Sequence, residues 1–343
     1  MEILLPIADV YTNPIKLIFI GFVVGILSGM LGIGGGIILN PVLIKIGVPS
    51  VIVVGTSISQ IIGASLSGFL TYLRSNLVDI KMGLYIVAFG TIGGIFGVFT
   101  INYFKHLGNV RDLVLSVYVV YLFIMGILIL IETVKNRGKE GEGKLKTLCD
   151  RLPVKTKFKV GERSVLIPVF IGLLSGTLSA IMGIGGGNLV TPALMYLAGY
   201  PIKMAVAISV FQMVFIASFL TFFHSLFNHG VDIVLGLILL IGSSFGAVFG
   251  AMIGQRLKKE YLKLSLVFLM IVVAVYSLMQ LLEGKREVYR GLMPDNYISY
   301  LLVHHPYLYS IAVVMFSLIV GFTVSMLTFR LKTLFVEKIY KEN

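Results

Sequence analysis

Long, uninterrupted apolar runs constrain this chain more than any other feature. Met82–Tyr103 and Val231–Gly254 each reach the roughly 20 residues that a helix needs to cross the hydrocarbon core of a bilayer. Inside a bilayer every backbone N–H and C=O must be bonded within the protein, so such runs form helices. The sequence does not show the alternating pattern of membrane barrel strands. With 57% hydrophobic residues, 13% charged residues and a mean hydropathy of +0.98, the chain is predicted to be an all-α polytopic membrane protein.

An internal duplication is the second constraint. The glycine run Gly32–Gly36, with the sequence Gly-Ile-Gly-Gly-Gly, recurs as Gly183–Gly187. The surroundings recur as well, and the matched positions include Gly21 with Gly172, Ser28 with Ser179, Pro41 with Pro192, Ser57 with Ser209, Gln60 with Gln212, and Val78-Asp79-Ile80 with Val231-Asp232-Ile233. Two homologous halves therefore form most of the chain.

Apolar segments and the polar stretches between them divide the chain into four regions. We expect a first transmembrane repeat over 17–131, a basic linker over 132–163, a second transmembrane repeat over 164–282, and a last helix with a basic tail over 283–343. In each repeat the first segment breaks at the glycines and resumes as a short piece, over 37–46 or 188–197. Three long segments follow in each repeat. The last helix, at about 307–329, has no counterpart in the first half.

The basic residues favour one of two topologies. If each broken segment turns back at its glycines as a re-entrant hairpin, each half crosses three times and the halves are inverted. If each broken segment spans, each half crosses four times and the halves are parallel. With 132–163 in the cytoplasm, the hairpin topology places most of the 28 Lys and Arg inside, whereas the spanning topology leaves Arg256, Lys258, Lys259 and the tail outside. The positive-inside preference therefore predicts inverted repeats.

The distribution of basic residues also predicts the cellular location of the protein and its partners. We expect a multi-pass plasma-membrane protein whose linker and C-terminus are cytoplasmic. The net charge of +12 lies in the connections between apolar segments, so it indicates orientation and not a nucleic-acid partner. The expected partners are the lipid bilayer and a small anion, with no cofactor and no metal, and the oligomeric state is open.

Inverted repeats with discontinuous helices are typical of secondary transporters, which bind their substrate near the midplane where the repeats meet. A glycine run leaves backbone N–H groups free to point into a cavity, next to the positive end of the following short helix, and this suits a small anion. The predicted anion site contains Gly34, Gly35, Gly36, Gly185, Gly186 and Gly187. The alternative is that the glycines only permit close helix packing or a tight turn.

Polar residues in nearby segments complete the predicted site. Gln60 and Gln212 lie near mid-bilayer in their segments. Ser57 and Ser209 precede them by one helical turn, so each serine shares a helix face with its glutamine. Polar groups at this depth are costly unless they face protein or water, and an uncharged amide can donate to an oxyanion. Interhelical hydrogen bonding is the alternative role. Three further candidates lie in the short pieces: Asn40, Asn188 and Thr191.

Acidic residues are missing at mid-depth from the predicted spans, so no carboxylate is evident for proton or sodium coupling. His224 is the nearest ionisable candidate, close to the end of its segment. Export of an anion from a cell with a negative interior gains about 2.3 kcal/mol per charge per 100 mV. Such export needs no coupling group.

The two glycine motifs, Gly29-Met-Leu-Gly-Ile-Gly-Gly-Gly-Ile-Ile-Leu-Asn-Pro41 and Ala180-Ile-Met-Gly-Ile-Gly-Gly-Gly-Asn-Leu-Val-Thr-Pro192, resemble those of the TauE/SafE sulfite-exporter family. The resemblance spans about 17–282. It implies a permease for small sulfur-containing anions such as sulfite or organosulfonates, in the plasma membrane of a prokaryote. The long basic linker and the unpaired last helix depart from the family pattern.

We therefore expect a transporter that moves a small, sulfur-containing oxyanion by alternating access to a central site. Two other classes of function stay open. An intramembrane hydrolase would use Ser65 or Ser67 with His224 as its base, although Ser65 matches Ala217 in the other half. A membrane scaffold without transport would leave the paired glutamines without a role.

Overall fold

The structure is a computed structural model that describes residues 2–135, 153–284 and 296–341. It is nearly all-helical, and eight of the described helices are long and apolar enough to cross a membrane. The first half contains α1 (Pro14–Leu31), α2 (Gly36–Ile46), α3 (Ser50–Leu73), α4 (Ile80–His106) and α5 (Val110–Lys135). The second half contains α7 (Leu166–Met182), α8 (Gly187–Tyr196), α9 (Ile202–Asn228), α10 (Ile233–Arg256) and α11 (Lys259–Leu282). These helices confirm the prediction of a polytopic membrane protein.

The prediction that the chain is all-α is wrong at two places. An antiparallel hairpin of β1 (Ile3–Leu5) and β2 (Val10–Thr12) precedes α1, and a second hairpin of β3 (Lys155–Phe158) and β4 (Gly161–Ser164) precedes α7. The second hairpin lies within the predicted linker except for its last residue, Ser164, and residues 136–152 of this linker are outside the described residues. Strands of three or four residues are too short for the period-2 pattern that identifies a strand in a sequence.

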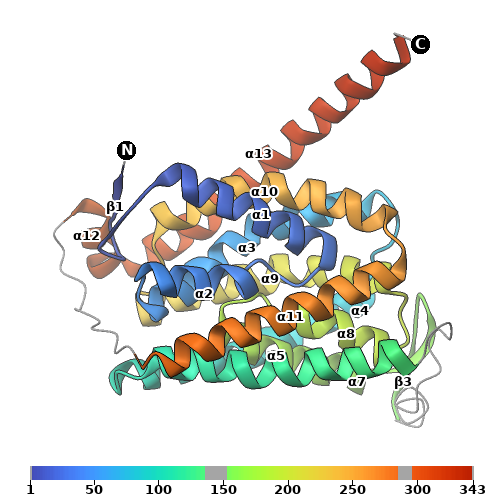
Figure 1. The fold of residues 1–343 in the computed structure, drawn as a ribbon, viewed down its shortest axis with the longest axis horizontal. Coiled ribbons are helices and arrows are strands. Elements are labelled where there is room, and N and C mark those ends of the chain that lie inside the picture. The colour runs from blue at the N-terminus through green and yellow to red at the C-terminus, as the bar shows by residue number, and fades with distance from the viewer. Residues whose placement is uncertain (1, 136–152, 285–295, 342–343) are drawn as a thin grey trace.

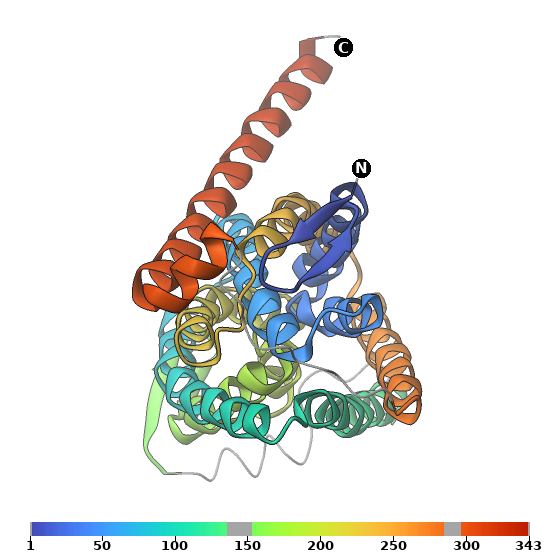
Figure 2. The same cartoon turned by 90° about the vertical axis from the view of Figure 1, so that its left-hand side faces the viewer.

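Two further helices follow the second half. They are α12 (Tyr297–His304) and α13 (Pro306–Lys341). Residues 285–295 of the predicted last region lie outside the part that the structure describes. α13 continues well beyond the predicted end at 329, and its C-terminal part projects from the body (Figure 1). In the view turned by 90°, most other helices are seen nearly end-on (Figure 2), so they run roughly along one direction.

Helices of one half pack closely along helices of the other. A methyl group placed on Gly21, Gly25 or Gly29 of α1 would come within 2.5 Å of a backbone carbonyl oxygen of α10. The contacts advance from Leu239 to Ala247 as α1 advances, so the two helices are parallel. α7 packs along α4 in the same way, with Gly176 against Gly90 and Ala180 against Gly97. Small residues let these backbones approach closely.

α3 and α9, which occupy equivalent positions in the two halves, are the most buried of the candidate spans. They run antiparallel. Gly55 near the start of α3 lies against Gly230, just after the end of α9, whereas Gly68 lies against Val210 near the start of α9. The rings of Phe69 and Phe211, with centroids 5.2 Å apart, make the same crossing.

In both halves the short helix returns toward the end of the bundle where the first helix began. Leu17 of α1 and Leu43 of α2 belong to one apolar cluster with Leu235 at the start of α10. α7 runs parallel to α4, and Tyr200, just after α8, donates to Asp79 at the start of α4. Figure 1 shows β1 and α12 at one end of the bundle and β3 at the other.

Candidate functional site

The two glycine runs meet at the centre of the molecule. A methyl group on Gly34 would lie 2.0 Å from the carbonyl oxygen of Ile184, and one on Gly36 would lie 2.0 Å from that of Gly183. A methyl group on Gly187 would lie 2.3 Å from the carbonyl oxygen of Gly32. Gly34, Gly185 and Gly186 also have positive φ angles of 76°, 71° and 75°. The positions therefore require glycine for close approach or for backbone conformation.

Carbonyl groups of these loops accept hydrogen bonds from the predicted polar residues. Ser209 Oγ donates to Gly32 O at 2.7 Å, and Thr191 Oγ1 donates to the same oxygen at 3.3 Å. Asn40 Nδ2 donates to Met182 O, and Gln212 Nε2 donates to Gly185 O at 3.2 Å. The bonds of Asn40, Thr191 and Ser209 cross from one half to the other. Polar side chains of both halves thus donate hydrogen bonds to carbonyl groups of the glycine loops and their flanking residues.

The N–H groups of the loops are left without such partners. Within the part of the chain that the structure describes, the N–H groups of Gly34, Gly35, Gly185 and Gly186 have no hydrogen-bond acceptor. All four residues are buried. Buried N–H groups without an acceptor are rare in proteins. The site therefore presents an excess of donors at the N-termini of α2 and α8, which is the condition for binding an anion.

Three predicted side chains are also free of partners. Among the described residues, Gln60 and Asn188 have no partner for either amide atom, and Ser57 has none for its hydroxyl. All three are 0% exposed. A methyl group on Gly35 would lie 3.0 Å from Gln60 Oε1, so the free amide of Gln60 lies beside Gly35. The structure thus brings the predicted residues of both halves to one region.

The loops contact each other directly, whereas the sequence predicted that they line a cavity. Met213 of α9 occupies the position between them, with Sδ 3.2 Å from the methyl positions of both Gly34 and Gly185. A cavity of about 290 Å³ lies elsewhere, between Asn76, Asp79 and Lys159 at the α3–α4 connection. The glycine site is therefore closed in this conformation.

Side chains outside the predicted anion site hold the loops and the helix ends beside them in place. Tyr118 of α5 lies 2.9 Å from both Gly36 O and Met182 O, and it is the donor to these carbonyls. Tyr72 donates to Gly29 O, and His224, at the matching position of α9, bonds to Ala180 O at 3.0 Å. Tyr118 and Met213 have no identical counterpart in the other half, so the repeat gave no signal for them.

His224 does not contact the serines of the hydrolase alternative. Its Nε2 bonds to Ala180 O and its Nδ1 to the Asn228 amide. Ser67 donates to Gly321 O, and within the described chain Ser65 has no hydrogen-bond partner. Both ring nitrogens are therefore occupied by structural bonds.

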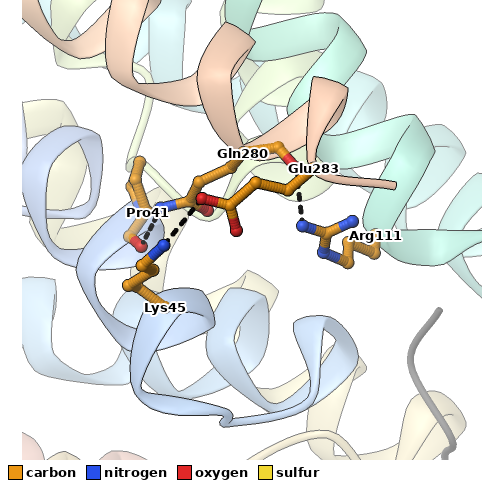
Figure 3. A network of polar contacts seen from close by, with 5 residues as sticks. All are labelled: Pro41, Lys45, Arg111, Gln280 and Glu283. Atoms are coloured by element: carbon orange, nitrogen blue, oxygen red, sulfur yellow. Dashed lines mark hydrogen bonds and ion pairs between the residues drawn. The ribbon is translucent and has the colours of Figure 1, made fainter. Parts of the chain in front are cut away.

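The C-terminal half of α2 is connected to α11 by a polar network (Figure 3). Gln280 Nε2 donates to Pro41 O at 2.8 Å, and the buried guanidinium of Arg111 donates to Gln280 O at 2.7 Å. Lys45 and Glu283 form an ion pair of 2.7 Å at the surface. Arg111 caps a C-terminal carbonyl of α11, where a positive charge is favourable.

The duplicated aspartates fasten each hairpin to the opposite half. Asp232 Oδ1 accepts from Val234 and Leu235 at the start of α10, and its Oδ2 accepts from Ile7 and Ala8 in the β1–β2 turn. Asp79 in the same way caps α4 and accepts from the N–H of Lys159 in the β3–β4 turn. The repeated Val-Asp-Ile was the sequence signal for this role, but it gave no indication of the hairpins.

Comparison with known proteins places this architecture in a family. The family model described as sulfite exporter TauE/SafE matches residues 17–277. The chain belongs to the sulfite exporter TauE/SafE family. This membership confirms the resemblance that the glycine motifs predicted. The TauE/SafE match covers both halves and ends within α11, so α12 and α13 lie beyond it.

Curated proteins to which the chain is similar are named as probable membrane transporters. The chain is 28% identical to a probable membrane transporter protein of Methanocaldococcus jannaschii over 277 residues, which is 77% of this chain and 94% of the relative. It is 27% identical to the probable membrane transporter protein YunE of Bacillus subtilis over 212 residues, which is 59% of this chain and 74% of the relative. No solved structure is a significant match. The protein is a multi-pass member of a membrane-transporter family.

Proposed function

We propose that this protein transports a small oxyanion, sulfur-containing as in sulfite or an organosulfonate, across the plasma membrane. The observation that carries the proposal is the set of four buried glycine N–H groups that lack an acceptor within the described chain. Oxyanion oxygens are the natural acceptors for such groups at helix N-termini. The unpartnered amides of Gln60 and Asn188 add neutral donors to the same region. The family name and the names of the relatives support a transport role.

The proposed mechanism is alternating access through inverted repeats, each with a re-entrant hairpin broken at its glycines. The antiparallel crossing of α3 and α9 supports the inversion, because equivalent helices of parallel repeats would run the same way. The return of α2 and α8 to their starting ends supports the hairpins. We place the β3–β4 hairpin, the linker and the C-terminus in the cytoplasm, following the basic residues.

The closed loops then correspond to an occluded conformation. Access from one side requires the bonds across the halves, such as Ser209 to Gly32 O and Asn40 to Met182 O, to break so that the loops separate. Met213 has a flexible thioether side chain that can move from between the loops at low cost. Alternating exposure of the two hairpins would carry the anion across.

Flux through proteoliposomes tests the proposal. Purified protein is reconstituted, a membrane potential is imposed, and flux of sulfite, thiosulfate, sulfoacetate and acetate is measured against protein-free vesicles. We expect potential-dependent flux of at least one sulfur oxyanion above that of acetate. Absence of flux for all four, with protein that is folded by circular dichroism and gel filtration, would contradict it and favour a scaffold.

A further inference from the structure

We infer that the two halves have different roles at the proposed site: Gln60 and Ser57 of α3 bind the anion, whereas their counterparts Gln212 and Ser209 of α9 hold the loops together. This inference rests on the proposed function and goes further, because it assigns the binding position to one of two sequence-equivalent sets of residues. Both sets consist of one serine and one glutamine, so only their hydrogen-bond partners distinguish the two roles.

The set on α9 is engaged in framework bonds. Ser209 Oγ donates to Gly32 O at 2.7 Å, across the boundary between the halves. Gln212 Nε2 donates to Gly185 O at 3.2 Å within its own half. Each donor is thus already paired with the carbonyl of a buried loop residue, and breaking such a bond is costly. An anion could recruit these groups only by breaking contacts that hold the loops.

The set on α3 is free. Over the described ranges, neither amide atom of Gln60 nor the hydroxyl of Ser57 has a hydrogen-bond partner, and both residues are 0% exposed. The position equivalent to Gly185 O is Gly34 O, and Gln60 does not donate to it. Fully buried amides without partners are exceptions in proteins and call for a ligand or another explanation.

Backbone conformation separates the halves at the same place. Gly35, the residue before α2, has φ −63° and ψ −24°, whereas its counterpart Gly186, before α8, has φ +75° and ψ −7°. Gly35 lies beside Gln60, with its methyl position 3.0 Å from Oε1 and 3.4 Å from Nε2, whereas Gly186 lies beside Ser175 of α7. The helix that Gly35 precedes has 11 residues, enough for a helix dipole at its N-terminus.

The chemistry of this position fits a small oxyanion. Gln60 Nε2, Ser57 Oγ and the N–H of Gly35 are three neutral donors from two elements, and donors of this kind form strong bonds to a charged oxygen. Because no donor carries a charge, release does not require separation of an ion pair. Specificity for an anion with several acceptor oxygens follows from the number of donors.

Two matched pairs of substitutions test the assignment in the full-length protein, with sulfite as the probe. Gln60→Met and Gln212→Met keep side-chain volume, and Ser57→Ala and Ser209→Ala remove one hydroxyl each. Sulfite affinity is measured by titration calorimetry in detergent, and melting temperature is measured without anion. We expect Gln60→Met to weaken sulfite binding by about ten-fold or more and to leave the melting temperature unchanged or higher. We expect Gln212→Met to lower the melting temperature and to change the affinity little.

The serine pair keeps the test decisive if Gln212→Met does not fold. Ser57→Ala should reduce affinity without destabilisation, and Ser209→Ala should destabilise with affinity retained. The assignment is overturned if folded α9 variants lose sulfite binding as much as the α3 variants, or if the α3 variants bind like the wild type. Wild-type protein that neither binds nor transports sulfite, thiosulfate, sulfoacetate or acetate would instead refute the proposed function.

Discussion

At the scale of single residues, the contact between the glycine loops makes a direct prediction. Gly36→Ala places a methyl group 2.0 Å from Gly183 O, a backbone atom that cannot move by itself. We expect a loss of about 3 kcal/mol or more in the free energy of unfolding, at the upper end of overpacking effects. Unfolding in mixed detergent micelles, followed by circular dichroism, measures it.

Gly126→Ala is the matched control. Gly126 is inside α5, and its methyl position is 3.3 Å from the nearest neighbour, a side-chain carbon of Ile271. Alanine is favoured over glycine in a helix by about 1 kcal/mol, so this variant should be as stable as the wild type or more so. Equal losses for Gly36→Ala and Gly126→Ala would show that the loops are not in contact.

Repetition in the sequence was sufficient to select the glycines and the polar residues that the structure brings together. It could not distinguish Ser57 from Ser209, because both have the same residue type in the same local pattern and only their long-range partners differ. It also missed Tyr118 and Met213, which have no identical counterparts. Partners across the halves depend on how the loops pack, and no local pattern encodes that packing.

At the scale of secondary-structure elements, the β1–β2 hairpin depends on one carboxylate. Asp232→Ala leaves four N–H groups without their acceptor, those of Ile7, Ala8, Val234 and Leu235. We expect the free energy of unfolding to fall by at least about 2 kcal/mol and limited proteolysis to begin at the N-terminal hairpin. Glu2→Ala, at an exposed acidic residue preceding the same hairpin, should change neither measurement.

The same carboxylate predicts a pH dependence. Burial raises the pKa of Asp232 above its ordinary value, although four backbone N–H donors act in the opposite direction. The folded state therefore binds the carboxyl proton of Asp232 more tightly than the unfolded state does. The stability that this proton contributes to the folded state decreases as pH rises from about 4 through the folded-state pKa.

The melting temperature of wild type minus that of Asp232→Asn should accordingly decrease as pH rises across this window. A difference that increases with pH would mean that the four donors outweigh burial and that the pKa is lowered.

Apolar run length located most of the long helices to within a few residues, but it missed the C-terminal extension of α13. The hairpins β1–β2 and β3–β4 and the helix α12 were not predicted, because each element is short and depends on contacts far away in the chain. The hairpin turns are positioned by Asp232 and Asp79. Neither aspartate is near the hairpin that it binds in sequence.

At the scale of the whole molecule, the proposed inversion predicts on which side of the membrane each hairpin lies. In a Cys149→Ser background, single cysteines replace Asp9 in the first hairpin and Glu162 in the second, both exposed. Inverted halves predict that a membrane-impermeant maleimide labels Asp9→Cys on intact cells and Glu162→Cys only after permeabilisation. Labelling of both positions from the same side would indicate parallel halves.

The β hairpin before each half is bound by an aspartate of the other half, and this makes each half depend on the other. Each aspartate accepts with one oxygen from the helix that it caps and with the other from a backbone N–H in the β-hairpin turn of the opposite half. A protein consisting of one half alone would leave its aspartate without the N–H donors of the opposite hairpin, and its own hairpin turn without an acceptor. Two copies of such a half could satisfy both groups by packing against each other. We therefore expect a single half, expressed by itself, to be complete only as a dimer.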